Sequence, residues 1–300
     1  MDYSITIAVL AGVGGMLGWG LADLFAKKTI DAIGDITTLT VAHIFGTGFV
    51  LLIVLYEFLA TGRVIQVPAD GMTWFGLAFF GALQAAVYLF VYIGFGKGQV
   101  AVLNPIFASF SGVVALISTL FLGEAVSLGV GMALLLTFLG VVLMSVDLEA
   151  LKIRQVAFAK VPGFSEIAIA TVLAAIWTLG WNSFVSGMDW LSYALWMYLA
   201  MTITLVAYSL VRGVSLRVGQ ASAWKYLALI GLTEMLAYVA ISWGYGATGA
   251  TAIVAVLSGA FSLPTILGAR LWLKERTTSI QLWGSLVIVF GVILIAFLTA

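Results

Sequence analysis

The sequence predicts an all-α integral membrane protein whose ten transmembrane helices form two inverted five-helix repeats. Three observations support this prediction. Of the 300 residues, 63% are hydrophobic and 9% are charged, whereas an average soluble domain has about 45–50% apolar and about 25% charged residues. Ten segments are long and apolar enough to cross a bilayer. Motifs of the first half recur about 150 residues later in the second half.

The ten predicted spans are joined by mostly short loops. A spanning helix needs about 20 predominantly apolar residues. The stretches that meet this requirement cover approximately residues 4–25, 37–59, 72–94, 98–121, 127–146, 165–186, 190–211, 222–244, 250–272 and 279–298. We expect residues 1–146 to form the first five-helix repeat, 147–164 a cytoplasmic linker and 165–300 the second repeat. No basic stretch precedes the first span, so we expect a retained helix rather than a cleaved signal peptide.

The repeat is visible in short motifs. Phe80–Gln84 (FGALQ) corresponds to Ile230–Glu234 (IGLTE), and Tyr88 corresponds to Tyr238. Because each half holds five spans, which is an odd number, the second half must enter the membrane from the opposite side. Inverted repeats of apolar helices are typical of secondary transporters.

Lysine and arginine are distributed unevenly between the two sides of the predicted membrane. Twelve of the thirteen basic residues fall on the side of the loops after spans 1, 3, 5, 7 and 9, and only Arg63 falls on the other. Because cytoplasmic loops carry an excess of lysine and arginine, we expect both termini on the extracytoplasmic side.

Glu234 is the charged residue that lies deepest in a predicted span. A carboxylate at that depth is costly and marks a transport pathway more often than a packing site. We expect Glu234 to bind a substrate ammonium or to take up a proton that is coupled to transport. The alternative is a protonated side chain that links helices by a hydrogen bond.

Two repeat-related helices carry polar side chains at intervals of four residues, which places them on one helical face. Gln84 and Tyr88 share such a face on the third span. Glu234, Tyr238 and Ser242 share one on the eighth. We expect both faces to line a midplane cavity, because these tyrosines lie deeper than an interfacial aromatic belt would.

Tryptophans flanked by small or polar residues occur in the first and sixth spans. Trp19 lies between two glycines, and Trp181 is followed by Asn182. These three side chains are candidates for substrate binding. Close helix packing through Gly14 and Gly18 explains the pattern of the first span equally well.

His43 and two prolines complete the candidate residues. His43 lies within span 2 and is either a proton carrier or a hydrogen-bonded packing residue. Pro264 lies inside span 9, so we expect a kink and a carbonyl without its usual donor. Pro105 lies near the start of span 4, where proline is tolerated. Asp23 is expected to pair with Lys27 near the end of span 1.

Several classes of function are excluded or disfavoured. The formal net charge is zero, so nucleic acid is not an expected partner. No cysteine is present, and His43 is the only histidine, so we expect neither a metal site nor a cofactor. No phosphate-binding glycine loop occurs, so the chain has no ATP-binding domain of its own. No catalytic constellation is evident, so an enzyme is not expected.

The ends of the two halves resemble the drug/metabolite transporter superfamily, in particular its ten-helix EamA-type exporters. Phe121–Glu124 precedes Gly140–Val142 in the first half, and Trp272–Glu275 precedes Gly291–Ile293 in the second. The glutamate before the last helix of each half resembles a recurrent acid of that family. The aromatic-rich first and sixth helices are similar to those of the YddG-type exporters of aromatic amino acids and methionine.

The resemblance implies a multi-pass protein of the bacterial inner (plasma) membrane, with a central cavity and with the fifth and tenth helices at the periphery. It implies export of amino acids, aromatic or hydrophobic ones and methionine, or of related small metabolites by alternating access. A multidrug or organic-cation exporter is the first alternative, and a non-transporting membrane enzyme or scaffold is the second. The expected partners are a small-molecule substrate and the lipid bilayer, and a monomer is the simplest assembly.

Overall fold

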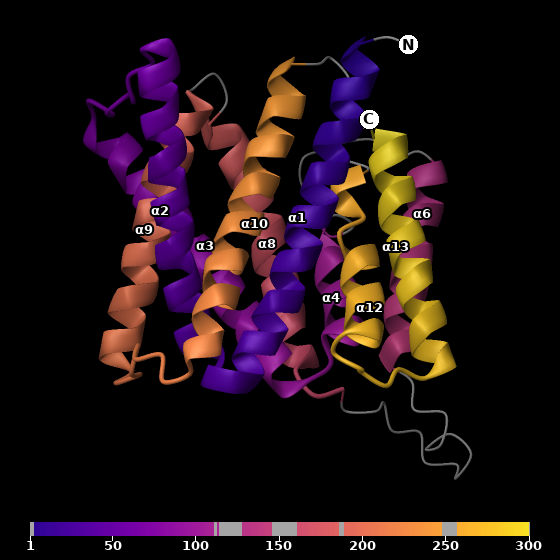
Figure 1. The fold of residues 1–300 in the computed structure, drawn as a ribbon. Coiled ribbons are helices and arrows are strands. Elements are labelled where there is room, and N and C mark those ends of the chain that lie inside the picture. The colour runs from indigo at the N-terminus through magenta and orange to yellow at the C-terminus, as the bar shows by residue number, and fades with distance from the viewer. Residues whose placement is uncertain are drawn as a thin grey trace.

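The computed structural model describes residues 3–110, 113, 128–145, 161–185, 189–247 and 257–299, and within them the chain is helical without strands. Figure 1 shows the helices. They are α1 (Tyr3–Ile33), α2 (Asp35–Thr61), α3 (Gly71–Lys97), α4 (Val100–Ala108), α6 (Leu128–Ser145), α8 (Phe164–Val185), α9 (Trp190–Val211), α10 (Ala221–Ala247), α12 (Ser262–Leu271) and α13 (Ser279–Thr299).

The length and composition of six helical segments suit a membrane crossing. These segments are Val9–Ile33, Asp35–Thr61, Gly71–Lys97, Phe164–Trp181, Leu191–Val211 and Ala221–Ile241. Consecutive helices alternate in direction, and both termini lie toward the upper end in Figure 1. The lower end, where α1, α3, α9 and α12 finish, carries lysines and arginines at those helix ends, and we call it the basic end.

The first helix is longer than the predicted span, which ended near residue 25. α1 continues to Ile33, and its last turns contain an ion pair between Lys27 and Asp31 four residues apart. Such a pair stabilises the helical turn in which it lies. Gly34 then reverses the chain directly into α2 with φ 89°, a left-handed conformation that glycine adopts without a steric penalty.

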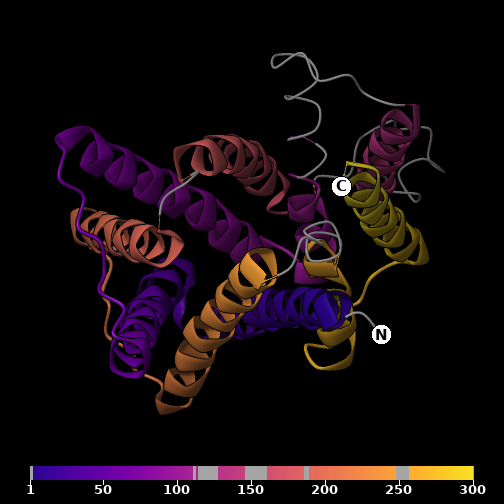
Figure 2. The same cartoon turned by 90° about the horizontal axis from the view of Figure 1, so that it is seen from above.

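Most helix pairs join one half of the chain to the other. α1 packs on α10, and the corresponding helices of the opposite halves, α8 and α3, pack in the same way. The same exchange relates the pairs α2–α10 and α9–α3. α4 packs on α12, and α6 packs on α13. Figure 2 shows α6 and α13 together at one edge of the bundle, so the other helices form the body around the candidate site.

Two repeat-related glycines lie at equivalent crossings. A β-carbon on Gly81 of α3 would lie 2.7 Å from the β-carbon of Ala200 in α9. A β-carbon on Gly231 of α10 would lie 2.6 Å from the backbone nitrogen of Gly46 in α2. Small residues permit such close approach where polar and dispersion contacts hold membrane helices together.

Hydroxyl groups join α2 to α9 across the interface between the two halves. Thr40 hydrogen bonds Ser209 over 2.9 Å, and Thr47 hydrogen bonds Thr202 over 2.8 Å. Hydrogen bonds of this kind link helices in a membrane. They lie before and after His43 along α2, and so hold the segment that carries this residue against α9.

The two prolines occupy positions that differ from those predicted. Pro105 is inside α4 rather than at its start. The carbonyl of Ala101, which would otherwise accept from residue 105, accepts a long hydrogen bond of 3.5 Å from the Ser285 hydroxyl of α13. A neighbouring helix thus supplies a hydrogen-bond donor in place of the backbone N–H that the proline lacks.

Pro264 lies in the first turn of α12, where the backbone requires no intrahelical donor. The interruption that we expected at this proline lies before it, at the turn formed by Ala260 and Phe261. The expected orphan carbonyl is also absent, because the carbonyl of Ala260 accepts from the backbone N–H of Leu263 over 2.9 Å. A tight turn has replaced the missing helical bond.

Candidate functional site

Glu234 of α10 and His43 of α2 meet inside the bundle. His43 is fully buried and Glu234 is 3% exposed. The His43 Nε2 atom lies 3.6 Å from Oε1 of Glu234. Neither atom has a hydrogen-bond partner among the described residues. The sequence singled out each residue separately, and the structure brings them together.

The hydrogen bond of the second ring nitrogen of His43, Nδ1, determines which nitrogen of the ring carries a hydrogen. Nδ1 lies 2.9 Å from the backbone carbonyl of Leu39. A carbonyl can only accept, so Nδ1 carries a hydrogen. Without a proton between them, the Nε2 lone pair would then face a carboxylate oxygen in a low-dielectric interior. One proton on either partner removes that repulsion, giving imidazolium with carboxylate or imidazole with carboxylic acid.

Three tyrosines surround this pair. The His43 ring stacks on Tyr198 of α9, with centroids 5.6 Å apart, and meets the edge of Tyr88 at 5.3 Å. Tyr198 also meets Tyr238 edge to face at 6.3 Å. Tyr198 was not among the predicted site residues, because its role follows from the packing of α9 on α2 and not from any repeat-related partner.

The predicted polar faces of α3 and α10 converge at Tyr238. Gln84 and Tyr88 of α3 are in polar contact with the Tyr238 side chain. Gln84 is 7% exposed, so an amide group is held inside the bundle. The side chains of Ser242 and Asn182, also predicted here, lie outside the described part of the chain, although both residues belong to helices.

Trp19 of α1 lies against the same tyrosine. Its ring meets Tyr238 edge to face at 5.8 Å and Phe261 at 6.0 Å. The indole Nε1 is buried and has no hydrogen-bond partner among the described residues. Close packing also occurs at this point, because a β-carbon on Gly18 would lie 2.6 Å from the carbonyl oxygen of Thr233. The close packing expected at the first-span glycines is therefore present, whereas substrate binding by Trp19 stays a prediction.

Trp181 makes its ring contacts in another aromatic group. It stacks on Trp177 at 5.5 Å and meets Phe80 at 5.6 Å. The Trp177 indole donates to the carbonyl of Phe80 over 3.0 Å and fixes this arrangement. No ring contact between the described side chains joins Trp181 to Trp19, so the two tryptophans do not face each other directly.

Asp23 is a second carboxylate of the bundle, and the predicted pair with Lys27 is wrong. Lys27 instead donates to Asp31 and to the carbonyl of Phe95, each over 2.8 Å. Asp23 accepts a hydrogen bond from the side-chain amide of Asn104 in α4. It is also close enough to Glu234 for the two carboxylates to interact electrostatically.

The sequence analysis assigned Asp23 to an ion pair at the helix end, because the first span was predicted to end two residues after it. The buried oxygen of its partner Asn104 has no hydrogen-bond partner in the described part of the chain. The signal that would have found the site is an aspartate and an asparagine, each with mainly apolar neighbours in the sequence, on two helices of the same half.

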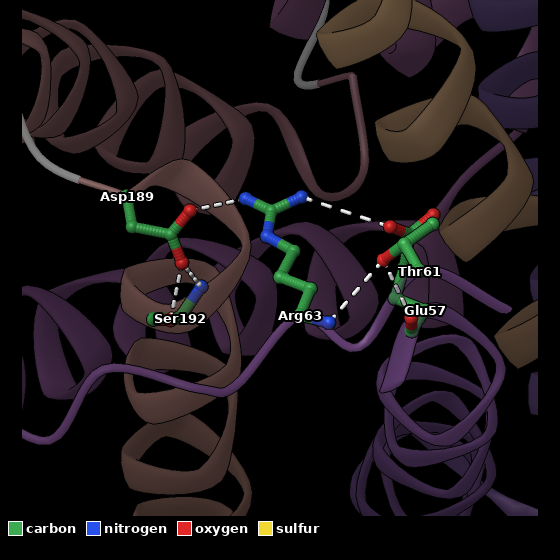
Figure 3. Close-up of polar contacts among 5 residues, drawn as sticks. All are labelled: Glu57, Thr61, Arg63, Asp189 and Ser192. Carbon is green, nitrogen blue, oxygen red and sulfur yellow. Dashed lines mark hydrogen bonds and ion pairs between the residues drawn. The ribbon is translucent and has the colours of Figure 1, made fainter. Parts of the chain in front are cut away.

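The only basic residue predicted on the extracytoplasmic side, Arg63, joins the two halves (Figure 3). Its guanidinium binds Asp189, the N-cap of α9, and lies 3.9 Å from Glu57. Asp189 also accepts from the backbone N–H of Ser192 over 3.0 Å. Burial opposes ionisation, but the hydrogen bonds from Ser192 and Arg63 hold the pKa of Asp189 below its usual value.

Glu275 joins the halves at the basic end. Its carboxylate oxygens accept from the backbone N–H groups of Val100 and Ala101 over 3.0 and 2.9 Å. These donors form the first turn of α4, where a helix leaves its N–H groups without intrahelical partners. The recurrent acid before the last helix of the second half is therefore a cap for a helix of the first half.

Metal binding is not indicated in the described residues, which contain no group of three or more histidine, cysteine, aspartate or glutamate side chains that could hold an ion. The candidate site is therefore built from one acid–imidazole pair, a second acid with its amide partner, and an aromatic wall. Such an arrangement can exchange a proton or bind a cation with an apolar body.

Comparisons with known proteins agree with this architecture. A solved structure described as "Crystal structure of protein" is similar over 96% of this chain and 96% of its own, with a TM-score of 0.65 and 15% identity, which shows a shared fold. No curated protein sequence matches. The EamA-like transporter family matches residues 6–146 and 162–297. The chain therefore belongs to the EamA-like transporter family and is a multi-pass membrane transporter of small molecules.

Proposed function

We propose that the chain exports aromatic or hydrophobic amino acids, methionine or related amine-bearing metabolites in exchange for protons. The observation that carries this proposal is the buried pair of His43 and Glu234, which requires one proton when no cation is bound. An ammonium group of the substrate satisfies the same carboxylate. Proton and substrate therefore compete for one site, which is the condition for antiport.

Glu234 is paired with either a proton or the substrate ammonium at each step of the exchange. The substrate ammonium binds the Glu234 carboxylate while the shared proton leaves to water on the side that is open. When the site opens to the other side, a proton returns to the pair and the ammonium is released. The membrane core then never holds an unpaired Glu234 carboxylate, which would be costly there.

Aromatic side chains supply the apolar part of the proposed site. Trp19, Tyr88 and Tyr238 lie around the acid–imidazole pair. Rings of this kind bind both an ammonium group and an aromatic or thioether side chain. Gln84 provides an amide for the remaining polar groups of the substrate.

Alternating access follows from the proposed inverted repeats, with residues 1–146 and 165–300 as the two halves. The exchange of helix pairs supports them, since α1–α10 corresponds to α8–α3 and α2–α10 corresponds to α9–α3. The distribution of lysine and arginine supports a cytoplasmic basic end, with both termini in the periplasm of a bacterial cell.

A second candidate function is the export of lipophilic organic cations. The observation that favours it is the presence of two intramembrane acids, Asp23 and Glu234, in electrostatic contact. His43 is the only basic side chain paired with either of them in the described residues. A cation without a carboxylate fits that charge balance.

The test is flux into proteoliposomes of labelled phenylalanine, tryptophan and methionine, with and without a pH gradient. We expect saturable uptake that the gradient accelerates, and loss of this acceleration in Glu234→Gln. Glu57→Gln is the matched control, because Glu57 is a carboxylate at the end of α2, outside the site. Normal transport by Glu234→Gln at every pH would refute the role of the pair. Flux of lipophilic cations without amino-acid flux would establish the second candidate.

A further inference from the structure

A cavity of about 820 Å³ opens at the basic end of the bundle. It lies where α1 and α3 end, α4 begins and the chain leaves α12. Its walls carry four basic side chains, and we call it the basic cavity. These side chains are Lys27, Lys28, Lys97 and Arg276. Its volume is in the range of small-molecule sites, which is about 300–1,000 Å³.

Two of these four basic groups are already paired. Lys27 binds Asp31, and Lys97 binds Glu166 over 2.6 Å. Among the described residues, the contact that Lys28 makes is with the face of the Trp272 ring, whose centroid lies 5.3 Å from the Lys28 Nζ atom.

Arg276 is the fourth of these groups, and it makes neither a hydrogen bond nor an ion pair within the described ranges. Lys28 and Arg276 therefore leave positive charge available to a ligand, on two segments from opposite halves of the chain.

An anion already occupies part of this cavity. Glu275, one of its lining residues, places its carboxylate on the N–H groups of Val100 and Ala101 at the start of α4. A helix N-terminus favours any anion by its exposed N–H groups and its dipole. Burial raises the pKa of Glu275 even though these two hydrogen bonds act in the opposite direction. A second carboxylate that reaches these N–H groups would compete with Glu275 for them.

We propose that the basic cavity binds the carboxylate of the transported molecule at the cytoplasmic entrance, and that this carboxylate takes the place of Glu275 on α4. The inference rests on the proposed function and narrows its substrate class to molecules that carry both an amine and a carboxylate. Lys28, Arg276 and the α4 N–H groups hold the carboxylate. Glu234 later holds the amine.

The start of α4 is also connected to the central acids. Asn104 lies one turn beyond Val100 on α4, and its amide binds Asp23. Release of Glu275 would therefore remove two hydrogen bonds from the start of the helix whose Asn104 holds the second carboxylate of the bundle. Binding of a substrate carboxylate at the entrance and rearrangement at Asp23 are linked through one short helix.

The test is calorimetric binding of phenylalanine and phenylalaninamide to the purified protein in nanodiscs of neutral lipid. Lys28→Gln and Arg276→Gln should each weaken phenylalanine binding about three- to tenfold, as expected for one partly exposed charge-assisted contact. Binding of phenylalaninamide, which lacks the carboxylate, should not change. Glu275→Gln should strengthen phenylalanine binding, because an amide is a weaker competitor for the α4 N–H groups.

Arg217→Gln is the control, since Arg217 is exposed at the same end and does not line the cavity. Equal losses for phenylalanine and phenylalaninamide, or an equal loss in the control, would overturn the proposal. Stabilisation by phosphatidylglycerol that depends on Lys28 and Arg276, without phenylalanine binding, would assign the cavity to a lipid headgroup and also overturn it.

The readout separates this inference from the proposed function. Amino-acid flux together with binding that does not depend on the carboxylate would refute the entrance site and leave the transport proposal standing. Carboxylate-dependent binding without any flux would retain the site and remove the transport proposal.

Discussion

Replacement of Gly231 by alanine tests whether close helix packing positions the candidate site. The new β-carbon would lie 2.6 Å from the backbone nitrogen of Gly46 and 2.9 Å from the backbone carbonyl of Ala42. Both neighbours belong to the backbone of α2 and cannot rotate away. α10 and α2 must therefore separate by about 0.8 Å to restore an ordinary contact of 3.4 Å.

The separation acts on the site because Gly231 lies three residues before Glu234, and its neighbours Ala42 and Gly46 lie on either side of His43 along α2. The distance of 3.6 Å between His43 and Glu234 would grow beyond 4 Å. We expect the variant to lose about 1–3 kcal/mol of stability through overpacking. We also expect the pH dependence of flux to weaken in parallel.

Thermal unfolding in detergent micelles and flux in proteoliposomes measure the two effects. Gly48→Ala is the control, since Gly48 lies on α2, the helix that Gly231 contacts, and a β-carbon on Gly48 meets nothing within 4 Å. That control should be neutral or more stable by up to about 1 kcal/mol, because alanine favours a helix over glycine. Equal melting temperatures and equal pH profiles for the two variants would refute the reasoning.

Three further perturbations follow from contacts at the ends and in the core of the bundle. Asp189→Asn should cost about 1 kcal/mol at neutral pH. The pKa of Asp189 in the folded protein is lower than its ordinary value of 3.8, so the extra stability of the wild type over the variant is fully present above pH 3.8. This extra stability should disappear as the pH falls through the lower folded-state pKa. A difference in melting temperature that persists in acid would contradict this reasoning. Asp23→Ala should lower the free energy of unfolding by about 1–3 kcal/mol, because it leaves the buried Asn104 amide unpaired. Asp23→Asn should recover most of that loss, as measured by denaturant titration. Equal losses in the two variants would exclude the hydrogen bond as the cause. Pro105→Ala should raise the melting temperature and should increase the free energy of unfolding by up to about 3 kcal/mol. The reason is that the new N–H restores the helical hydrogen bond to the carbonyl of Ala101. A lower melting temperature would mean that the kink itself is required for packing.

Much of the architecture was predictable from the sequence because the bilayer constrains a chain residue by residue. Apolar length predicted the helices around Gly81, Glu234 and Tyr238, and lysine and arginine marked one end of them. The ends of the helices were less predictable. α1 extends to Ile33 and its last turns hold the ion pair of Lys27 and Asp31, a contact that an apolar-length criterion does not register.

Part of the candidate site was also predictable. The depth of Glu234 and its spacing to Tyr238 identified one face of α10, and the repeat identified Gln84 and Tyr88 on α3. Contacts between helices were not predictable in the same way, because no local pattern states which helices are neighbours. Tyr198 is an example, since only the packing of α9 on α2 brings it against His43.

The sequence by itself determined the solvent, the faces of the helices, and the costly residues among them, because burial of each polar group in lipid depends on its own position along a span. The tertiary structure alone decided the partners. His43 faces Glu234, Asn104 holds Asp23, and Glu275 caps α4, in each case through helices far apart in the chain. A partner depends on the mutual approach of two helices, and that approach is fixed by packing at residues such as Gly231, where the absence of one methyl group lets two backbones meet.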